Sequence, residues 1–193
     1  FNNNTKHFFK KLVDRFYINP SKTRFGFVAY SSTVYATLKP NACSNKTCLH
    51  QKINALRYDA GTTCTGDAIT KASELFENNS RKRIIMVVTD GEEYCGGRPG
   101  STVPAKARAA RAKRIDTFAV GVGDNVFVGN KPGAADLRAI SNGRTNRQFV
   151  AHDFRTLDSR RFITKLENQI CPVRANAKGD IKVTVDITGF DRA

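Results

Sequence analysis

Three glycine- and aspartate-containing loops hold the side chains that could carry chemistry. They are residues 58–69 (YDAGTTCTGDAI), 87–91 (VVTDG) and 121–126 (GVGDNV). The first resembles a phosphate-binding loop, but Asp67 follows Gly66 where that loop has a lysine. The third begins like a dinucleotide-binding loop but has Val126 at the place of the last glycine. Nucleotide binding is therefore disfavoured, and Asp90 of the second loop fits either a ligand-binding residue or a turn residue.

Helix-like and strand-like segments alternate around these loops. Apolar residues at helical spacing predict helices at 5–16, 49–56, 66–76, 104–114, 136–141 and 156–170. Extended apolar runs predict strands at 24–31, 33–38, 84–89, 117–122 and 148–150. This alternation predicts an α/β fold, a doubly wound and mostly parallel sheet with helices on both faces. Such sheets bind ligands at the carboxyl ends of their strands, where the three loops fall.

Length and composition fit one folded domain. The chain has 193 residues, 40% of them hydrophobic, which is enough for a substantial core. Its longest aliphatic run, residues 84–88, is far shorter than the roughly 20 residues of a membrane span. The chain begins with Phe1 and carries no signal peptide, which predicts a mature product or a fragment.

The cysteines and the glycosylation sequons predict a secreted glycoprotein. The five cysteines are Cys43, Cys48, Cys64, Cys95 and Cys171. None forms a C-x-x-C pair or a zinc-like cluster, which disfavours metal binding through sulfur. Cys43 and Cys48 bracket a short polar loop and predict a local disulfide, and sequons begin at Asn3, Asn45 and Asn78. The odd number of cysteines implies a partner outside this sequence.

The chain is strongly basic, since 32 Lys and Arg against 17 Asp and Glu give a net charge of +15. Five cations crowd the helix expected at 104–114: Lys106, Arg108, Arg111, Lys113 and Arg114. Other basic clusters lie at 81–83 and 160–161. A secreted basic surface attracts acidic polysaccharide or acidic matrix protein. Nucleic acid is disfavoured because no aromatic-plus-basic stacking motif is present, and a merely solvated surface is the alternative.

Several segments, in the expected order, resemble the von Willebrand factor type A domain. They are FNNNTKHFFKKLVDRF, RFGFVAYSSTVYATL, YDAGTTCTGDAI, RKRIIMVVTDGEE, RIDTFAVGVGD, DLRAISN and FVAHDFRTL, between Phe1 and about Pro172. The resemblance implies a metal-ion-dependent adhesion site, where Thr63 gives the hydroxyl ligand and Asp90 the carboxylate for Mg²⁺ or Ca²⁺. An acidic group of a partner fills the open coordination position. The resemblance also implies neighbouring loops for Cys64 and Cys95, and hence a disulfide between them.

The start of the sequence departs from the family pattern. The family's first strand and its Asp-x-Ser-x-Ser metal loop are absent, because the chain begins inside the first helix. A sheet without its central strand exposes backbone groups on two neighbours. We therefore expect a truncated domain at residues 1–172, whose missing part also holds the partner of Cys171. With Thr63 and Asp90 alone, we expect weak or no binding of Mg²⁺ or Ca²⁺.

Residues 173–193 have two interpretations. Apolar residues alternate as in a half-buried strand: Ile181, Val183, Val185 and Ile187. The favoured interpretation is a linker and a strand that start a following domain. In the other, the tail fills the vacant central position and Asp186 and Thr188 join the metal site, while Phe190, at the third ligand position, has no oxygen to give.

These patterns predict a non-enzymatic interaction module of the extracellular matrix, since no nucleophile has a catalytic partner in the sequence. Matrilins, beaded-filament collagens and mollusc shell or byssal proteins contain the similar domain. The expected partners are acidic matrix proteins, polysaccharides or collagen-like components. Strong basicity and the Cys43–Cys48 loop favour an invertebrate matrix, fibrous or mineralised. The alternative is an integrin-like or receptor-type adhesion domain that depends on a divalent cation.

Overall fold

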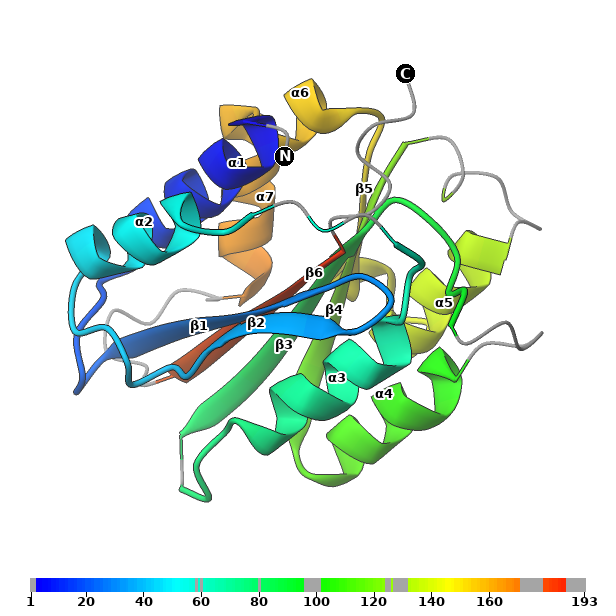
Figure 1. Ribbon diagram of the computed structural model, residues 1–193, viewed down its shortest axis with the longest axis horizontal. Helices are drawn as coiled ribbons and strands as arrows, with labels where there is room; N and C mark the ends of the chain where they lie inside the picture. The colour runs from blue at the N-terminus through cyan, green and yellow to red at the C-terminus, as the bar shows by residue number, and fades with distance from the viewer. Residues whose placement is uncertain are drawn as a thin grey trace.

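The computed structural model describes residues 3–57, 59, 61–79, 81–95, 102–123, 126, 132–170 and 179–186. A central sheet is covered by helices on both faces (Figure 1). In chain order the elements are α1 (Asn3–Asp14), β1 (Thr23–Tyr30), β2 (Val34–Leu38), α2 (Lys46–Asn54), α3 (Thr65–Glu74), β3 (Lys82–Thr89), α4 (Val103–Ala112), β4 (Ile115–Val122), α5 (Pro132–Ser141), the short 3-10 helix η2 (Thr145–Arg147), β5 (Gln148–Ala151), α6 (Phe154–Leu157), α7 (Arg160–Ile170) and β6 (Gly179–Asp186).

The sheet is mostly parallel. Within the described residues it has six strands in the order β2-β1-β6-β3-β4-β5. β2 runs antiparallel to β1, and every other neighbouring pair is parallel. Strands buried on both faces carry continuous apolar runs, which explains why Ile84, Met86 and Val88 alternate with equally buried aliphatic residues in β3. The predicted doubly wound α/β fold is therefore correct.

β6 occupies the central position of the sheet. It pairs with β1 from Thr23↔Gly179 to Tyr30↔Asp186, and with β3 from Lys82↔Gly179 to Val88↔Val185. The favoured interpretation of the tail, a strand that starts another domain, does not describe residues 179–186. They complete this sheet, because β1 and β3 would otherwise each present a row of unpaired backbone groups in the interior. The boundary expected at Pro172 lies outside the described residues.

Two apolar layers fill the space between the sheet and its helices. On one face, α1, α2, α6 and α7 cover β-strand residues such as Ile84, Met86 and Ile181. On the other face, α3, α4 and α5 cover Ile85 and Val87. Successive residues of β3 thus point to opposite cores, as the two-residue period of a strand requires.

Helix α1 shows how the pattern of the sequence becomes structure. The five apolar residues at helical spacing are at most 5% exposed: Phe8, Phe9, Leu12, Val13 and Phe16. α1 begins at Asn3 and ends at Asp14, so Phe16 lies just past its end but still packs in the same core. The predicted face is correct, and the predicted range 5–16 is shifted by two residues.

The helix predicted at 156–170 is two helices, α6 and α7. α6 begins earlier because Asp153 caps it, its side chain accepting a hydrogen bond from the Thr156 N–H at 2.6 Å. The helix is then interrupted at Ser159. The Ser159 hydroxyl accepts a hydrogen bond from the Phe162 N–H at 3.3 Å, just before α7 begins at Arg160. Both hydrogen bonds favour a new helix start over continuation. None of the helices in the described ranges has the length and apolar character needed to cross a membrane.

Candidate functional site

The carboxyl ends of the central strands meet at one edge of the sheet. Tyr30 at the end of β1 lies opposite Asp186 at the end of β6. Val88 of β3 lies opposite Val185, so Asp186 is at the level of Thr89, and Asp90 follows directly. The register therefore brings the backbones of Asp186 and Asp90 to the same end of neighbouring strands. Thr188, the other ligand expected from the tail, lies outside the described residues.

Thr63 is attached to the segment that follows Asp90. Its backbone pairs with Tyr94 in an isolated antiparallel bridge, with N···O distances of 3.1 Å and 2.9 Å. Thr63 and Asp90 are both partly buried. The two side chains that the family resemblance named as ligands thus belong to two loops that are joined to each other.

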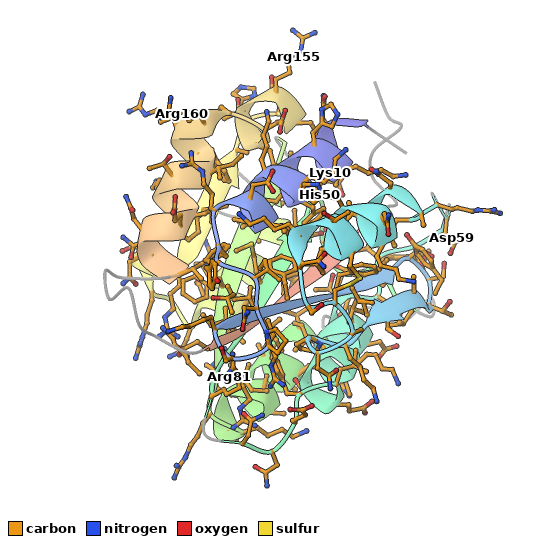
Figure 2. The ribbon with its side chains drawn as sticks, turned by 90° about the vertical axis from the view of Figure 1, so that its left-hand side faces the viewer. Lys10, His50, Asp59, Arg81, Arg155 and Arg160 are labelled. Carbon is orange, nitrogen blue, oxygen red and sulfur yellow. A yellow bond between two sulfur atoms is a disulfide. The ribbon has the colours of Figure 1, made fainter. Side chains whose placement is uncertain are left out.

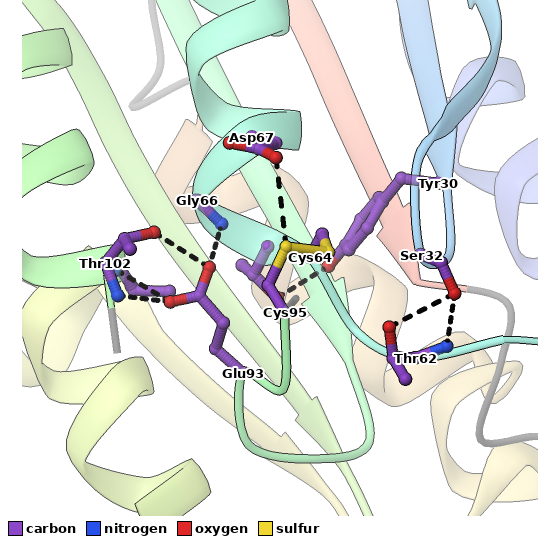
Figure 3. The surroundings of a disulfide bond; sticks show 11 residues. Tyr30, Ser32, Thr62, Cys64, Gly66, Asp67, Glu93, Cys95 and Thr102 are labelled. Atoms are coloured by element: carbon purple, nitrogen blue, oxygen red, sulfur yellow. Dashed lines mark hydrogen bonds between the residues drawn. A yellow bond between two sulfur atoms is a disulfide. The ribbon is translucent and has the colours of Figure 1, made fainter. Parts of the chain in front are cut away.

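A disulfide joins the same two loops. Cys64 and Cys95 are bonded, with their Cα atoms 4.7 Å apart, and Cys64 is 1% exposed (Figure 3). The Cys64 N–H also donates to the Ser31 carbonyl at 2.9 Å, which ties the bridge to the end of β1. The expected pairing of Cys64 with Cys95 is present, and it fixes the loop of Thr63 next to the loop of Asp90.

Asp67 lies beside this disulfide. One of its carboxylate oxygens is 3.8 Å from Cys95 Sγ, and the three side chains Cys64, Asp67 and Cys95 cluster closely enough to suggest a metal group. A disulfide sulfur has neither a proton to donate nor a thiolate charge to offer a cation. The cluster is therefore a disulfide with an adjacent exposed carboxylate, and sulfur is not a metal ligand there.

Glu93 organises the loop that follows Asp90. The side chain is 8% exposed; its Oε1 accepts from the Gly66 N–H at 2.7 Å and from the Thr102 hydroxyl at 2.9 Å. Its Oε2 accepts from the Thr102 N–H and from the Val103 N–H, the latter at 3.2 Å. Gly66 is in the first turn of α3 and Val103 begins α4. One carboxylate therefore caps the N-termini of two helices, where the helix dipoles favour a negative charge (Figure 3).

The glycine at Gly66 is needed for this arrangement. A Cβ on Gly66 would lie 2.0 Å from the Thr102 hydroxyl and 2.8 Å from Glu93 Oε1. On the other side of Glu93, its own N–H donates to Asp136 Oδ2 at 2.9 Å, and Asp136 is 4% exposed in α5. The loop between β3 and α4 is thus attached to three helices.

The loop after β1 completes the edge. The Ser31 hydroxyl donates to Asp59 Oδ2 at 2.7 Å. The Ser32 hydroxyl accepts from the Thr62 N–H at 2.8 Å (Figure 3). Ser31, Ser32 and Asp59 add further oxygen atoms to the neighbourhood of Thr63. The donors at this edge are hydroxyls and carboxylates, the oxygen ligands that hard cations such as Mg²⁺ and Ca²⁺ prefer, so the residue types fit a divalent ion.

Sequence reasoning did not find Glu93, the Ser31–Asp59 hydrogen bond or the exposure of Tyr94, whose ring is 54% exposed beside Thr63. Glu92 and Glu93 are adjacent and chemically identical, yet Glu92 is exposed. Contacts with Gly66, Thr102 and Val103, all distant from Glu93 in the sequence, separate their roles. Tyr94 could have been noticed as an aromatic residue in a polar loop.

The basic residues expected on one surface have different roles. Arg108, Lys113 and Arg114 are exposed, and Lys106 is partly buried. Arg111 instead directs Nη1 to the carbonyls of Ala139 and Ile140, at 3.0 Å and 3.1 Å, at the end of α5. Burial lowers the pKa of Arg111, and the neighbouring cations Arg108, Arg147 and Arg144 lower it further. The Arg111 guanidinium therefore holds α4 against α5, and the role of these five residues in binding a polyanion stays a prediction.

The remaining expected residues are those of the local disulfide and the glycosylation sequons. Cys43 and Cys48 form a disulfide with a Cα–Cα distance of 5.6 Å. Asn45, exposed inside this loop, caps α2 by accepting from the Cys48 N–H at 2.9 Å. Asn78 is exposed. The side chain of Asn3 and the whole of Cys171 lie outside the described residues.

The long-range disulfide should contribute more stability than the local one. Replacing Cys64 and Cys95 together by Ser is expected to lower the free energy of unfolding by about 4 kcal/mol, because the bridge closes a separation of 31 residues. The Cys43→Ser/Cys48→Ser pair closes a separation of 5 and should cost about 2 kcal/mol. Urea denaturation of both double variants measures the two free energies of unfolding. A larger loss for the Cys43→Ser/Cys48→Ser variant would contradict the expectation that the bridge closing the longer loop contributes more stability.

The von Willebrand factor type A domain family model matches residues 1–162. The chain belongs to this family. It is 30% identical over 181 residues to the transmembrane cell adhesion receptor mua-3 of Caenorhabditis elegans, covering 89% of this chain and 4% of the receptor. It is 28% identical over 160 residues to the collagen alpha-4(VI) chain of Mus musculus, covering 80% of this chain and 6% of that one. The chain therefore spans only a small part of these relatives.

A solved structure has the same fold. Proximal thread matrix protein 1 from the mussel byssus, with a zinc-occupied MIDAS motif, superimposes with a TM-score of 0.74 at 22% identity. The superposition covers 87% of this chain and 40% of the mussel protein. The relatives are matrix and adhesion proteins, in agreement with the class of protein predicted from the sequence.

Proposed function

We propose that this chain is a non-enzymatic adhesion module of the extracellular matrix, secreted as part of a larger protein, that binds matrix proteins or polysaccharides. Part of this binding runs through a divalent cation, Mg²⁺ or Ca²⁺, at the carboxyl edge of the sheet. The observation that carries the proposal is the register of β6, which brings Asp186 to the edge that already holds Thr63 and Asp90. The expected source in a fibrous or mineralised invertebrate matrix stays a prediction.

Three residues hold the ion in this proposal. Thr63 gives a hydroxyl, and Asp90 and Asp186 give carboxylates, so the site has two negative charges where Thr63 and Asp90 alone would have one. The bound ion supplies a coordination position for an acidic group of the partner. Tyr94 is exposed and its backbone pairs with that of Thr63, so it fits a contact with the partner, since aromatic residues are enriched in protein interfaces.

A receptor-type adhesion domain is the second candidate. It is favoured by the likeness to mua-3, whose name describes a transmembrane cell adhesion receptor. The same edge would then bind its partner at a cell surface. Both functions share the divalent cation, so the first experiment is common to them.

Loss of the Asp186 carboxylate should weaken cation binding. In isothermal titration calorimetry with Mg²⁺, and separately with Ca²⁺, Asp186→Ala is expected to lower the affinity about tenfold or more. The matched control is Asp180→Ala, which removes the same group near the other end of β6, opposite Arg24 and Arg83 in the register. Equal affinities for Asp186→Ala and the unchanged chain would reject Asp186 as a ligand. A Zn²⁺ titration shows whether the edge prefers a softer ion.

A further inference from the structure

An open hollow of about 420 Å³ lies at the other edge of the sheet, where β3 and β4 begin. Four cationic residues line it together with two amides: Arg81, Arg83, Lys113, Arg114, Asn78 and Asn79. Parallel strands place their amino ends and their carboxyl ends at opposite edges, so the hollow is remote from Thr63 and Asp90. Arg81 correspondingly lies well away from Asp59 in Figure 2.

Among the residues that the structure describes, the lining of this hollow contains four cationic side chains and no acidic one. The two acids nearest in sequence are occupied elsewhere. Glu77 Oε2 accepts from Arg24 at 3.0 Å and from Asn79 at 3.1 Å. Asp116 pairs with Arg147 at 2.8 Å and with Lys82 at 3.8 Å. Both carboxylates thus have cationic partners outside the hollow, Arg24 for Glu77 and Arg147 and Lys82 for Asp116, while the described lining carries four cationic side chains.

Two of the four cations are fixed by the protein. The Arg83 Nη2 donates to the Lys113 carbonyl at 2.6 Å, and Arg81 donates to the Lys22 carbonyl. The Lys113 and Arg114 side chains are exposed at the turn between α4 and β4. Like charges held together repel one another, and a bound anion relieves that repulsion. Two guanidiniums fixed by carbonyls and two exposed cations together match a ligand with several oxyanion groups.

We propose that the hollow is a binding site for a sulfated polysaccharide, separate from the cation site. The choice of a polysaccharide rests on the proposed matrix function, while the anionic character rests on the lining alone. The volume is within the range of about 300–1,000 Å³ typical of ligand sites, and the exposed amide of Asn78 supplies a neutral donor and acceptor suited to sugar hydroxyls. The hollow shares Lys113 and Arg114 with the polyanion surface predicted from the sequence and adds Arg81 and Arg83 to them.

The test measures binding of a fully sulfated heparin tetrasaccharide to the full chain at about 0.15 M salt, where charges act over about 8 Å. The Lys113→Gln/Arg114→Gln variant is expected to lose about tenfold or more in affinity. The Arg160→Gln/Arg161→Gln variant removes the same charge from exposed positions on α7, far from Arg81 in Figure 2, and should lose less than about threefold. The Lys106→Gln/Arg108→Gln variant makes the same comparison on α4. Circular dichroism of each variant excludes misfolding.

Three outcomes would overturn the proposal. Equal losses in the three double variants would mean binding by net charge alone. A loss confined to Lys106→Gln/Arg108→Gln would move the site to α4. Binding of a hyaluronan tetrasaccharide, which has carboxylates and no sulfates, or of oligo(dT) as tightly as heparin would reject sulfate recognition. Chelation with EDTA should leave heparin binding unchanged, so failure of the cation site and failure of this site are separate results.

Asn78 gives a second, independent test. It lines the hollow and begins a glycosylation sequon, so an N-glycan there would occupy the entrance. Chain made without N-glycans is expected to bind the tetrasaccharide more tightly than glycosylated chain, and Asn78→Gln should restore binding in a glycosylating host. The matched control Asn45→Gln, at the sequon in the Cys43–Cys48 loop, should not. With occupancy of Asn78 established by mass spectrometry, equal binding with and without its glycan would place the ligand elsewhere.

Discussion

A chain that ends at residue 178 is expected to lose its cooperative thermal transition, because the sheet loses its central strand. β6 pairs with β1 from Gly179 to Asp186 and with β3 along most of the same length. Each buried backbone group left without a partner costs about 1–3 kcal/mol. Several such groups exceed the whole stability of an ordinary domain, roughly 5–15 kcal/mol.

Far-UV circular dichroism and a thermal scan measure this effect. The control is Ile181→Ala in the full chain, which keeps the strand but removes a side chain that is 1% exposed. It should lower the free energy of unfolding by about 2–5 kcal/mol and keep a cooperative transition. A synthetic peptide of residues 179–186 should restore structure to the shortened chain. An unchanged transition after the truncation would show that β6 is dispensable.

Replacing Glu93 by Ala is expected to lower the free energy of unfolding by about 4 kcal/mol. The substitution leaves the N–H groups of Gly66, Thr102 and Val103 without their acceptor, at the starts of two helices. Glu93→Gln keeps one acceptor oxygen but places an NH₂ group against N–H donors, so it should also be strongly destabilising.

Urea denaturation with Glu92→Ala as the control checks this prediction. Glu92 is the neighbouring residue of the same type, but it is exposed, so its removal should change stability by less than about 0.5 kcal/mol. Similar values for Glu92→Ala and Glu93→Ala would reject the two-helix cap. Because Glu93 also attaches the loop after Asp90, Glu93→Ala is expected to weaken Mg²⁺ binding as well.

Much of the fold could be predicted because periodic burial determines it. The apolar run of β3 and the apolar face of α1 both identify their elements directly, since the cores on the two faces of the sheet need those side chains. The position of β6 could be recognised only as an alternative. A strand pattern gives the burial of a segment but not its neighbours, which depend on contacts across the whole chain.

The candidate site, like the fold, could be predicted from the sequence only in part. Thr63 and Asp90 could be named as candidate ligands because motifs of the family mark them. The Cys64–Cys95 disulfide could be expected because the family fold places their two loops side by side. Glu93 could not be distinguished from Glu92, because its role depends on Thr102 and Gly66, which are distant in the sequence. The hydrogen bonds of Arg111 could not be predicted for a similar reason. A basic helix shows which residues are charged, but not which of them meet the carbonyls at the end of α5.

The double pairing of β6 also determines how the domain responds to mechanical force. Both neighbours of β6 are parallel to it and bond to it along nearly its whole length. A pull on Asp186 along the strand axis therefore loads two rows of hydrogen bonds in shear, and these must break together. A sideways pull would instead open the bonds one after another. In a tissue under tension, the domain would resist extension along this strand far better than peeling across it.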